Sequence, residues 1–137
     1  MSEQWEDVEV PRGTFIGWGE IGQAITFEVV TYSDSDGSDF NNQPCPEVVG
    51  ILTADAVNYR DKGTRKETLD KGEFITLTCG QANLSKAIRQ AGLEPGHLVR
   101  VTFEDTYKTA KGDGKAFKVQ VNRAHAAAPK VDAEDLY

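Results

Sequence analysis

The chain has 137 residues, a length typical of one compact domain, with 39% hydrophobic and 27% charged residues, as in ordinary globular proteins. This composition excludes a disordered or fibrous protein, and because no run of 18 apolar residues occurs, it excludes a transmembrane helix. The formal net charge of −7 argues against a nucleic-acid partner, since phosphates are bound by Lys and Arg.

The charges are distributed unevenly along the chain. Residues 1–57 carry one basic and eleven acidic side chains, whereas residues 58–123 carry thirteen basic and eight acidic ones. Residues 124–137 carry one basic and three acidic side chains. A basic segment therefore lies between acidic ends, and such local charge bears on binding rather than on fold. The alternative interpretation is a solvated surface of mixed charge.

Residues 1–7 are acidic and lack the basic and apolar parts of a secretory signal, so we expect a cytoplasmic protein. Cys45 and Cys79 are 34 positions apart, with only His97 and His125 as further ligands, and this spacing does not favour zinc. We expect Cys79 to be a small buried residue and Cys45, between two prolines, to lie in a loop. No metal or cofactor is expected.

Alternating apolar and polar side chains predict strands in the first third of the chain. Residues 24–32 place Ile25, Phe27 and Val29 on one face. The glycines before them suggest a bulge or turn where an earlier strand, 13–18, bends into this one. The pattern indicates a half-buried strand.

The polar, Gly-containing run at 33–39 predicts an exposed, mobile loop. Residues 48–56 are apolar and rich in β-branched side chains, which predicts a second strand that continues toward Tyr59. A turn is predicted at 61–63. Residues 73–79 alternate again and predict a third strand.

The pattern changes to a helical period at residues 83–92. Four apolar side chains recur at the spacing of one helix face: Leu84, Ala87, Ile88 and Ala91. Asn83 is the expected N-cap and Gly92 the expected C-terminal stop. One short amphipathic helix is therefore predicted.

Residues 98–107 and 116–123 are predicted to form a terminal hairpin around a turn at 111–115. Its side chains expected to face inward are Val99, Val101, Phe103, Phe117, Val119 and Val121. The predicted order is three strands, one helix and two strands. A five-stranded oligonucleotide-binding (OB) barrel has its helix between strands 3 and 4, so we expect an all-β fold of this type. An α+β sandwich would give the same order.

Three segments of residues 70–123 carry a resemblance to a known family: 80–88 (GQANLSKAI), 96–101 (GHLVRV) and 111–119 (KGDGKAFKV). Through them this part of the chain resembles the second half of the OB-fold single-stranded-DNA-binding proteins of bacteriophages. The resemblance implies a DNA-binding OB domain over residues 1–123 that protects or organises single-stranded DNA in phage replication or recombination, in the host cytoplasm.

The C-terminal residues, 124–137, begin with an Ala/Pro linker and continue with an acidic tail. Bacterial single-strand-binding proteins end similarly, which implies docking of replication and recombination proteins. The residues concerned are Asp132, Glu134, Asp135, Leu136 and Tyr137. The tail departs from that pattern, since it is short, lacks the penultimate proline and ends in Tyr rather than Phe. The alternative is a disordered end without a partner.

Binding to single strands requires cations along the phosphates and aromatic faces for unpaired bases. Residues 59–66 form the densest basic cluster, and residues 107–115 lie on a loop that OB folds use for ligands. The candidate DNA-binding residues are Trp18, Tyr32, Tyr59, Arg60, Lys62, Arg65, Lys66, Arg100, Tyr107, Lys108, Lys111, Lys115 and Lys118. As alternatives, Trp18 is a core residue, and both Tyr59 and Tyr107 cap the barrel rim. Phe103 and Phe117 are expected to pack in the core.

Catalytic motifs are missing from the sequence. It contains no phosphate-binding G-x-x-x-x-G-K-[ST] loop and no H-E-x-x-H, and residues 17–22 match G-x-G-x-x-G in spacing only. We therefore expect a binding protein rather than an enzyme, with single-stranded DNA as its partner, no membrane and potential homo-oligomers. The alternative is a protein-interaction module of a virion or assembly, and the sequence does not separate DNA from RNA.

Overall fold

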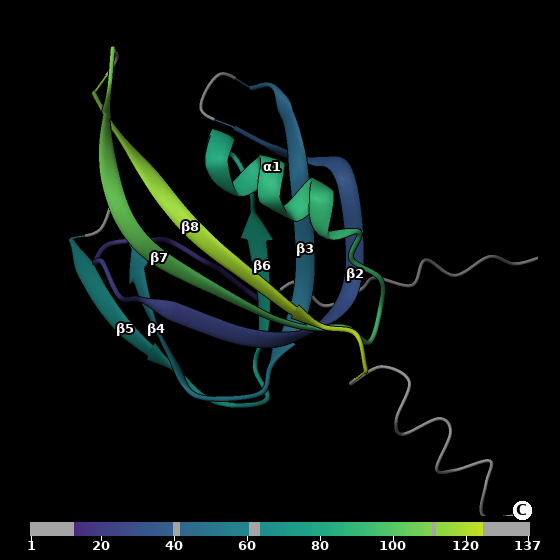
Figure 1. Ribbon diagram of the computed structural model, residues 1–137. Coiled ribbons are helices and arrows are strands. Elements are labelled where there is room, and N and C mark those ends of the chain that lie inside the picture. The colour runs from purple at the N-terminus through teal and green to yellow at the C-terminus, as the bar shows by residue number, and fades with distance from the viewer. Residues whose placement is uncertain (1–12, 40–41, 61–63, 111, 125–137) are drawn as a thin grey trace, which may run out of the picture.

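The computed structural model describes residues 13–39, 42–60, 64–110 and 112–124, which fold mainly into β-structure with one helix (Figure 1). The strands are β1 (Thr14–Phe15), β2 (Ala24–Ser38), β3 (Pro44–Leu52), β4 (Ala56–Arg60), β5 (Arg65–Leu69), β6 (Phe74–Thr78), β7 (Leu98–Thr109) and β8 (Gly112–Asn122), and the helix is α1 (Ala82–Ala91). None of the helical structure in these ranges is long and apolar enough to cross a bilayer.

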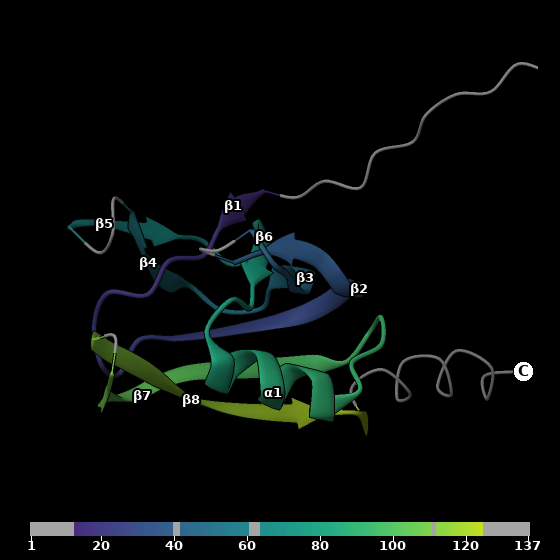
Figure 2. The same cartoon turned by 90° about the horizontal axis from the view of Figure 1, so that it is seen from above.

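Six strands form one curled sheet in the order β1-β6-β3-β2-β7-β8, and β4 and β5 form a separate antiparallel hairpin. All neighbouring strands of the sheet are antiparallel except β1 and β6. The sheet curls into a half-barrel, and α1 packs against β8 and β3 (Figures 1 and 2). The mostly β fold is as predicted, but the described residues contain eight strands rather than five.

The core lies inside the curl of the sheet, and alternation predicted most of it correctly. The inward side chains of β2, β6 and β7 are almost fully buried: Ile25, Phe27, Val29, Ile75, Leu77, Val99 and Val101. Leu84 and Ile88 of α1 are also fully buried, because they occupy one face of the helix. Phe103 and Phe117 belong to this core, as predicted.

β2 is longer than predicted, and the expected mobile loop at 33–39 is wrong. The strand continues to Ser38 and pairs with β3 beyond an irregularity that begins after Ser33. The pairing places Cys45 in β3 with 4% of its surface exposed, so the prediction of a loop cysteine is also wrong. Gly37 permits this, because a Cβ there would lie 3.0 Å from the Cys45 sulfur. Burial raises the pKa of the Cys45 thiol.

The predicted strand at 48–56 is two strands, since β3 ends at Leu52 and β4 begins at Ala56. β5 was not predicted, because its sequence, RKETL, shows no apolar alternation. The predicted strand at 13–18 is reduced to the two residues of β1, and the predicted turn at 111–115 is wrong from Gly112 onward, where β8 begins.

The helix begins two residues earlier than predicted, and its N-cap is Gln81 rather than Asn83. The Asn83 side chain instead accepts a hydrogen bond from the Phe117 backbone N–H at 2.8 Å, which fixes α1 to β8. Gly92 ends the helix in the left-handed conformation (φ 60°), as the sequence predicts.

Substituting Gly50 of β3 tests the packing of the curled sheet. An added Cβ would lie 2.4 Å from the Phe27 ring and 2.8 Å from the Glu28 carbonyl oxygen. We expect Gly50→Ala to lower the free energy of unfolding by about 1–3 kcal/mol through overpacking, measured by urea denaturation. Gly80→Ala is the control, because its nearest atom would be 3.2 Å away. Equal losses in the two variants would contradict the described packing.

Candidate nucleic-acid interface

Residues 13–23, which we call the arm, run from one side of the half-barrel to the other. At the start, β1 pairs with β6, and the Ile16 N–H donates to the Thr76 carbonyl at 3.0 Å. At the end, the Gly22 N–H donates to the Phe103 carbonyl and the Phe103 N–H donates to the Gln23 carbonyl, both at 2.8 Å. The arm therefore connects β6 and β7, which are not neighbours in the sheet.

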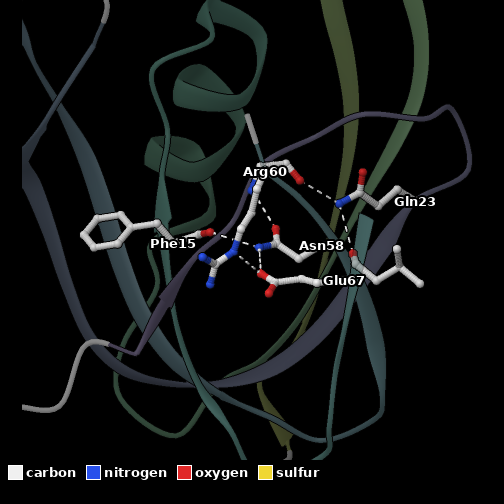
Figure 3. A network of polar contacts seen from close by, with 7 residues as sticks. Phe15, Gln23, Asn58, Arg60 and Glu67 are labelled. Atoms are coloured by element: carbon white, nitrogen blue, oxygen red, sulfur yellow. Dashed lines mark hydrogen bonds and ion pairs between the residues drawn. The ribbon is translucent and has the colours of Figure 1, made fainter. Parts of the chain in front are cut away.

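A fully buried amide, Asn58 of β4, joins the arm to the β4–β5 hairpin (Figure 3). Its Oδ1 accepts from the Gly17 N–H at 2.8 Å. Its Nδ2 donates to the Phe15 carbonyl at 3.3 Å and to the Glu67 carboxylate at 2.7 Å. These bonds use both donors and the acceptor of the side chain, so its burial is compensated.

A second amide, Gln23, makes a similar connection (Figure 3). Its Oε1 accepts from the Gly19 N–H at 2.9 Å. Its Nε2 donates to the Gly17 carbonyl at 2.8 Å and to the Val57 carbonyl at 3.1 Å. The two amides together fix the middle of the arm against β4.

Glu67 extends the network toward the solvent. Its carboxylate accepts from Arg60 Nε at 2.7 Å as well as from Asn58. The bonds from Arg60 and Asn58 hold the pKa of Glu67 below its usual range, so the carboxylate stays ionised and orients the guanidinium. Sequence reasoning missed Gln23, Asn58 and Glu67. The sequence contains one signal for this network. Asn58 lies two positions after the apolar Ala56, so in a strand the two side chains share a face, and a polar residue there needs hydrogen-bond partners.

Tyr59 and Tyr107 each have a ring lying against a glycine. A Cβ at Gly19 would be 2.4 Å from the Tyr59 ring, and a Cβ at Gly114 would be 2.5 Å from the Tyr107 ring. The Tyr59 hydroxyl donates to the Glu20 carboxylate at 2.5 Å, and this bond raises the Tyr59 pKa. Tyr107 keeps 42% of its surface exposed. The glycines therefore support two aromatic rings at the molecular surface.

Tyr59 lines two clefts, both of which involve the arm. The first, of about 330 Å³, includes Ile21, Ala24 and Lys66. The second, of about 550 Å³, is formed by residues 13–17 with Tyr59 and Arg60. An aromatic residue and a cation line each cleft, which is the combination that single-strand binding uses, and the carboxylate of Glu20 also lines the first cleft.

The surface of the first cleft continues across the sheet. In one row Ala24 pairs with Thr102, which pairs with Lys118. Because adjacent strands are about 4.8 Å apart, Lys118 lies about 10 Å from Ala24 along the sheet. In the next row the Arg100 Nε donates to the Thr26 hydroxyl at 3.3 Å. We call the surface from the two clefts to Lys118 and Arg100 the hairpin surface.

The hairpins β4–β5 and β7–β8 extend toward the same side of the molecule in both views (Figures 1 and 2). The structure brings Tyr59, Lys66, Arg100 and Lys118 onto the hairpin surface. Gly114 and Lys118 are four positions apart on β8, so they lie on the same face of the strand. Tyr107 pairs with Gly114 and therefore lies on the same face of the β7–β8 hairpin as Lys118.

Two predicted stacking residues lie elsewhere. Trp18 is only 8% exposed, and its ring packs edge-on against Phe117 at a centroid distance of 5.0 Å. Its prediction as a base-stacking platform is therefore wrong, and the core alternative holds. Tyr32 is half-buried, eight residues along β2 from Ala24, and its hydroxyl donates to Asp34. It does not join the hairpin surface.

Other predicted cations are less concentrated. Lys115 lies over the Phe103 ring, with its ammonium 5.9 Å from the centroid. In the strand register, Lys108 lies opposite Asp113, and Arg65 lies opposite Arg60 at the end of the β4–β5 hairpin. The remaining predicted residues lie outside the described ranges: Lys62, Lys111, Asp132, Glu134, Asp135, Leu136 and Tyr137.

Among the residues that the structure describes, no group of three or more His, Cys, Asp and Glu is placed to hold a metal ion. The sequence matches no protein-family model, and comparisons with curated proteins and with solved structures gave no match.

Removing the Asn58 side chain tests the attachment of the arm. Asn58→Ala deletes three hydrogen bonds and leaves the Gly17 N–H unsatisfied, so we expect the free energy of unfolding to fall by about 2–3 kcal/mol. Urea denaturation measures this. Gln90→Ala, an exposed change on α1, should alter it by less than about 0.5 kcal/mol. If Asn58→Ala is as stable as this control, the amide does not hold the arm.

Proposed function

We propose that this protein binds single-stranded DNA, without strong sequence preference, across the hairpin surface. The observation that carries the proposal is that Tyr59 and Lys66 line one cleft whose surface continues to Lys118 and Arg100. Rings serve as stacking faces for unpaired bases, and cations follow the phosphates. The resemblance of residues 70–123 to phage single-stranded-DNA-binding proteins supports phage replication or recombination as the setting.

We also propose that the half-barrel is an open OB fold. Strands β7, β2, β3 and β6 lie side by side in this order, which is the order of a Greek key. β8 follows as the fifth strand, and α1 lies in the chain between the third and fourth of these strands. A partly open, five-stranded Greek-key barrel is the OB architecture. In this assignment the β4–β5 hairpin is an insertion between the second and third strands.

The exposed acidic residues at the far end of β2 make that end a less favourable place for DNA than the hairpin surface. Asp34 and Asp36 are exposed near the far end of β2, where they repel phosphates. The net charge of −7 is compatible with DNA binding because binding depends on the local field. On the proposed path the acidic Glu20 bonds to Tyr59 and Glu67 to Arg60, and the cations Lys66, Arg100 and Lys118 lie beside them.

Titration of the protein with a fluorescently labelled oligo-dT strand tests the proposal. We expect binding at micromolar protein in low salt, weakening as salt rises, because cations of the protein displace counterions from the DNA. Double-stranded DNA and single-stranded RNA of equal length are the comparison ligands. If the protein binds none of the three ligands at low salt, the proposal is rejected and the protein-interaction module is favoured.

Charge-removing variants locate the binding surface. Lys66→Ala and Lys118→Ala should each weaken binding and reduce the slope of log K against log salt by about 0.7, the contribution of one phosphate contact on a single strand. The matched control is Lys86→Ala, which removes the same charge from the exposed side of α1. Equal slopes for all three variants would place the DNA on another surface.

A further inference from the structure

Phe15 is the most exposed large hydrophobic side chain in the described ranges, with 56% of its surface accessible. It lies on β1, and the next residue, Ile16, packs against the core. Alternation along the strand therefore directs the Phe15 ring outward. Sequence reasoning did not include this residue among the DNA-binding candidates.

The backbone beneath this ring is held on both sides. Phe15 pairs with Thr76 of β6, and its carbonyl accepts from Asn58. Figure 3 shows the carbonyl directed into the polar network and the ring directed away from it. The ring is therefore presented from a fixed position, which reduces the entropy lost when a ligand binds.

The ring lies at a cleft of about 550 Å³ formed by residues 13–17, Tyr59 and Arg60. This volume is within the usual range of small-molecule sites, roughly 300–1,000 Å³. Glycine is required at Gly17, because a Cβ there would be 2.1 Å from the Tyr59 carbonyl oxygen. The close approach of the arm to β4 thus shapes the cleft.

Arg60 provides the charge of this cleft. Its Nε donates to Glu67 at 2.7 Å, and its side chain remains 53% exposed. An exposed flat ring and an oriented guanidinium in one cleft match the two parts of a nucleotide, since a base stacks on the ring and its phosphate pairs with the cation.

We propose that the Phe15 cleft holds one unpaired base of the bound strand, stacked on the Phe15 ring, with Arg60 facing the adjacent phosphate. This inference rests on the proposed function and adds a contact on the arm, beyond the strands and loops of the barrel. A strand following this path crosses from the Phe15 cleft past Tyr59 to Lys66.

Three substitutions at Phe15 test the stacking. Phe15→Ala should weaken oligo-dT binding by about 5- to 150-fold, the effect of losing one stacked base. Phe15→Tyr keeps the ring and should retain binding, whereas Phe15→Leu keeps apolar surface without a flat face and should lose affinity as Phe15→Ala does. All three should melt close to the wild-type temperature, because the ring is exposed.

An abasic strand of the same length separates base from phosphate. Wild type and Phe15→Ala should bind this strand equally, and the salt slope for oligo-dT should be the same in both. Arg60→Gln should instead reduce the salt slope by about 0.7.

The outcomes distinguish the two proposals. If wild type does not bind oligo-dT, the proposed function fails. If wild type binds and Phe15→Ala binds equally well, the base site is wrong while the function stands. If Phe15→Leu binds as wild type does, or if Phe15→Ala loses the same affinity for the abasic strand, stacking at Phe15 is contradicted.

Discussion

The side chain of Asn58 fixes the arm to the β4–β5 hairpin through its hydrogen bonds. A fully buried amide is costly unless its donors and acceptor are satisfied, and here they bind Gly17, Phe15 and Glu67. The arm and the β4–β5 hairpin, which are about 40 residues apart in sequence, therefore meet at one side chain. The compensation is available only when the arm and both strands of the β4–β5 hairpin are in place.

The arm has several structural roles because of this attachment. It places Trp18 in the core against Phe117, and it provides Gly19 as the support of the Tyr59 ring. It also attaches the β4–β5 hairpin to the rest of the domain, since β4 and β5 do not pair with the six-stranded sheet. Core packing and the proposed binding surface are thus fixed by the same residues.

The sequence was informative where burial follows a regular period. Alternation identified the inward side chains of β2, β6 and β7, and the helical period identified α1 with its end at Gly92. It failed in β5 and in the far half of β2 from Ser33 onward, because strands with polar side chains on both faces show no apolar pattern. There the pairing with a neighbouring strand overrides local composition.

The site was predictable only in part for the same reason. The basic residues cluster in the sequence at 59–66 and 107–115, which predicted cations at the two hairpins. Which of these cations share a surface depends on the strand register, and the sequence alone does not determine the register. Lys118 and Arg100 join the hairpin surface through their pairing with Thr102 and Thr26. The exposure of Phe15 and the burial of Trp18 both depend on the path of the arm, which is set by the distant residue Asn58.

The most direct test is a map of backbone amide chemical shifts in the ¹⁵N-labelled protein as an oligo-dT strand is added. We expect the largest changes in the arm, in β4–β5 and around Lys118, with α1 and the far half of β2 unchanged. Changes confined to α1 and to the residues around Asp34 would show that DNA does not bind at the hairpin surface.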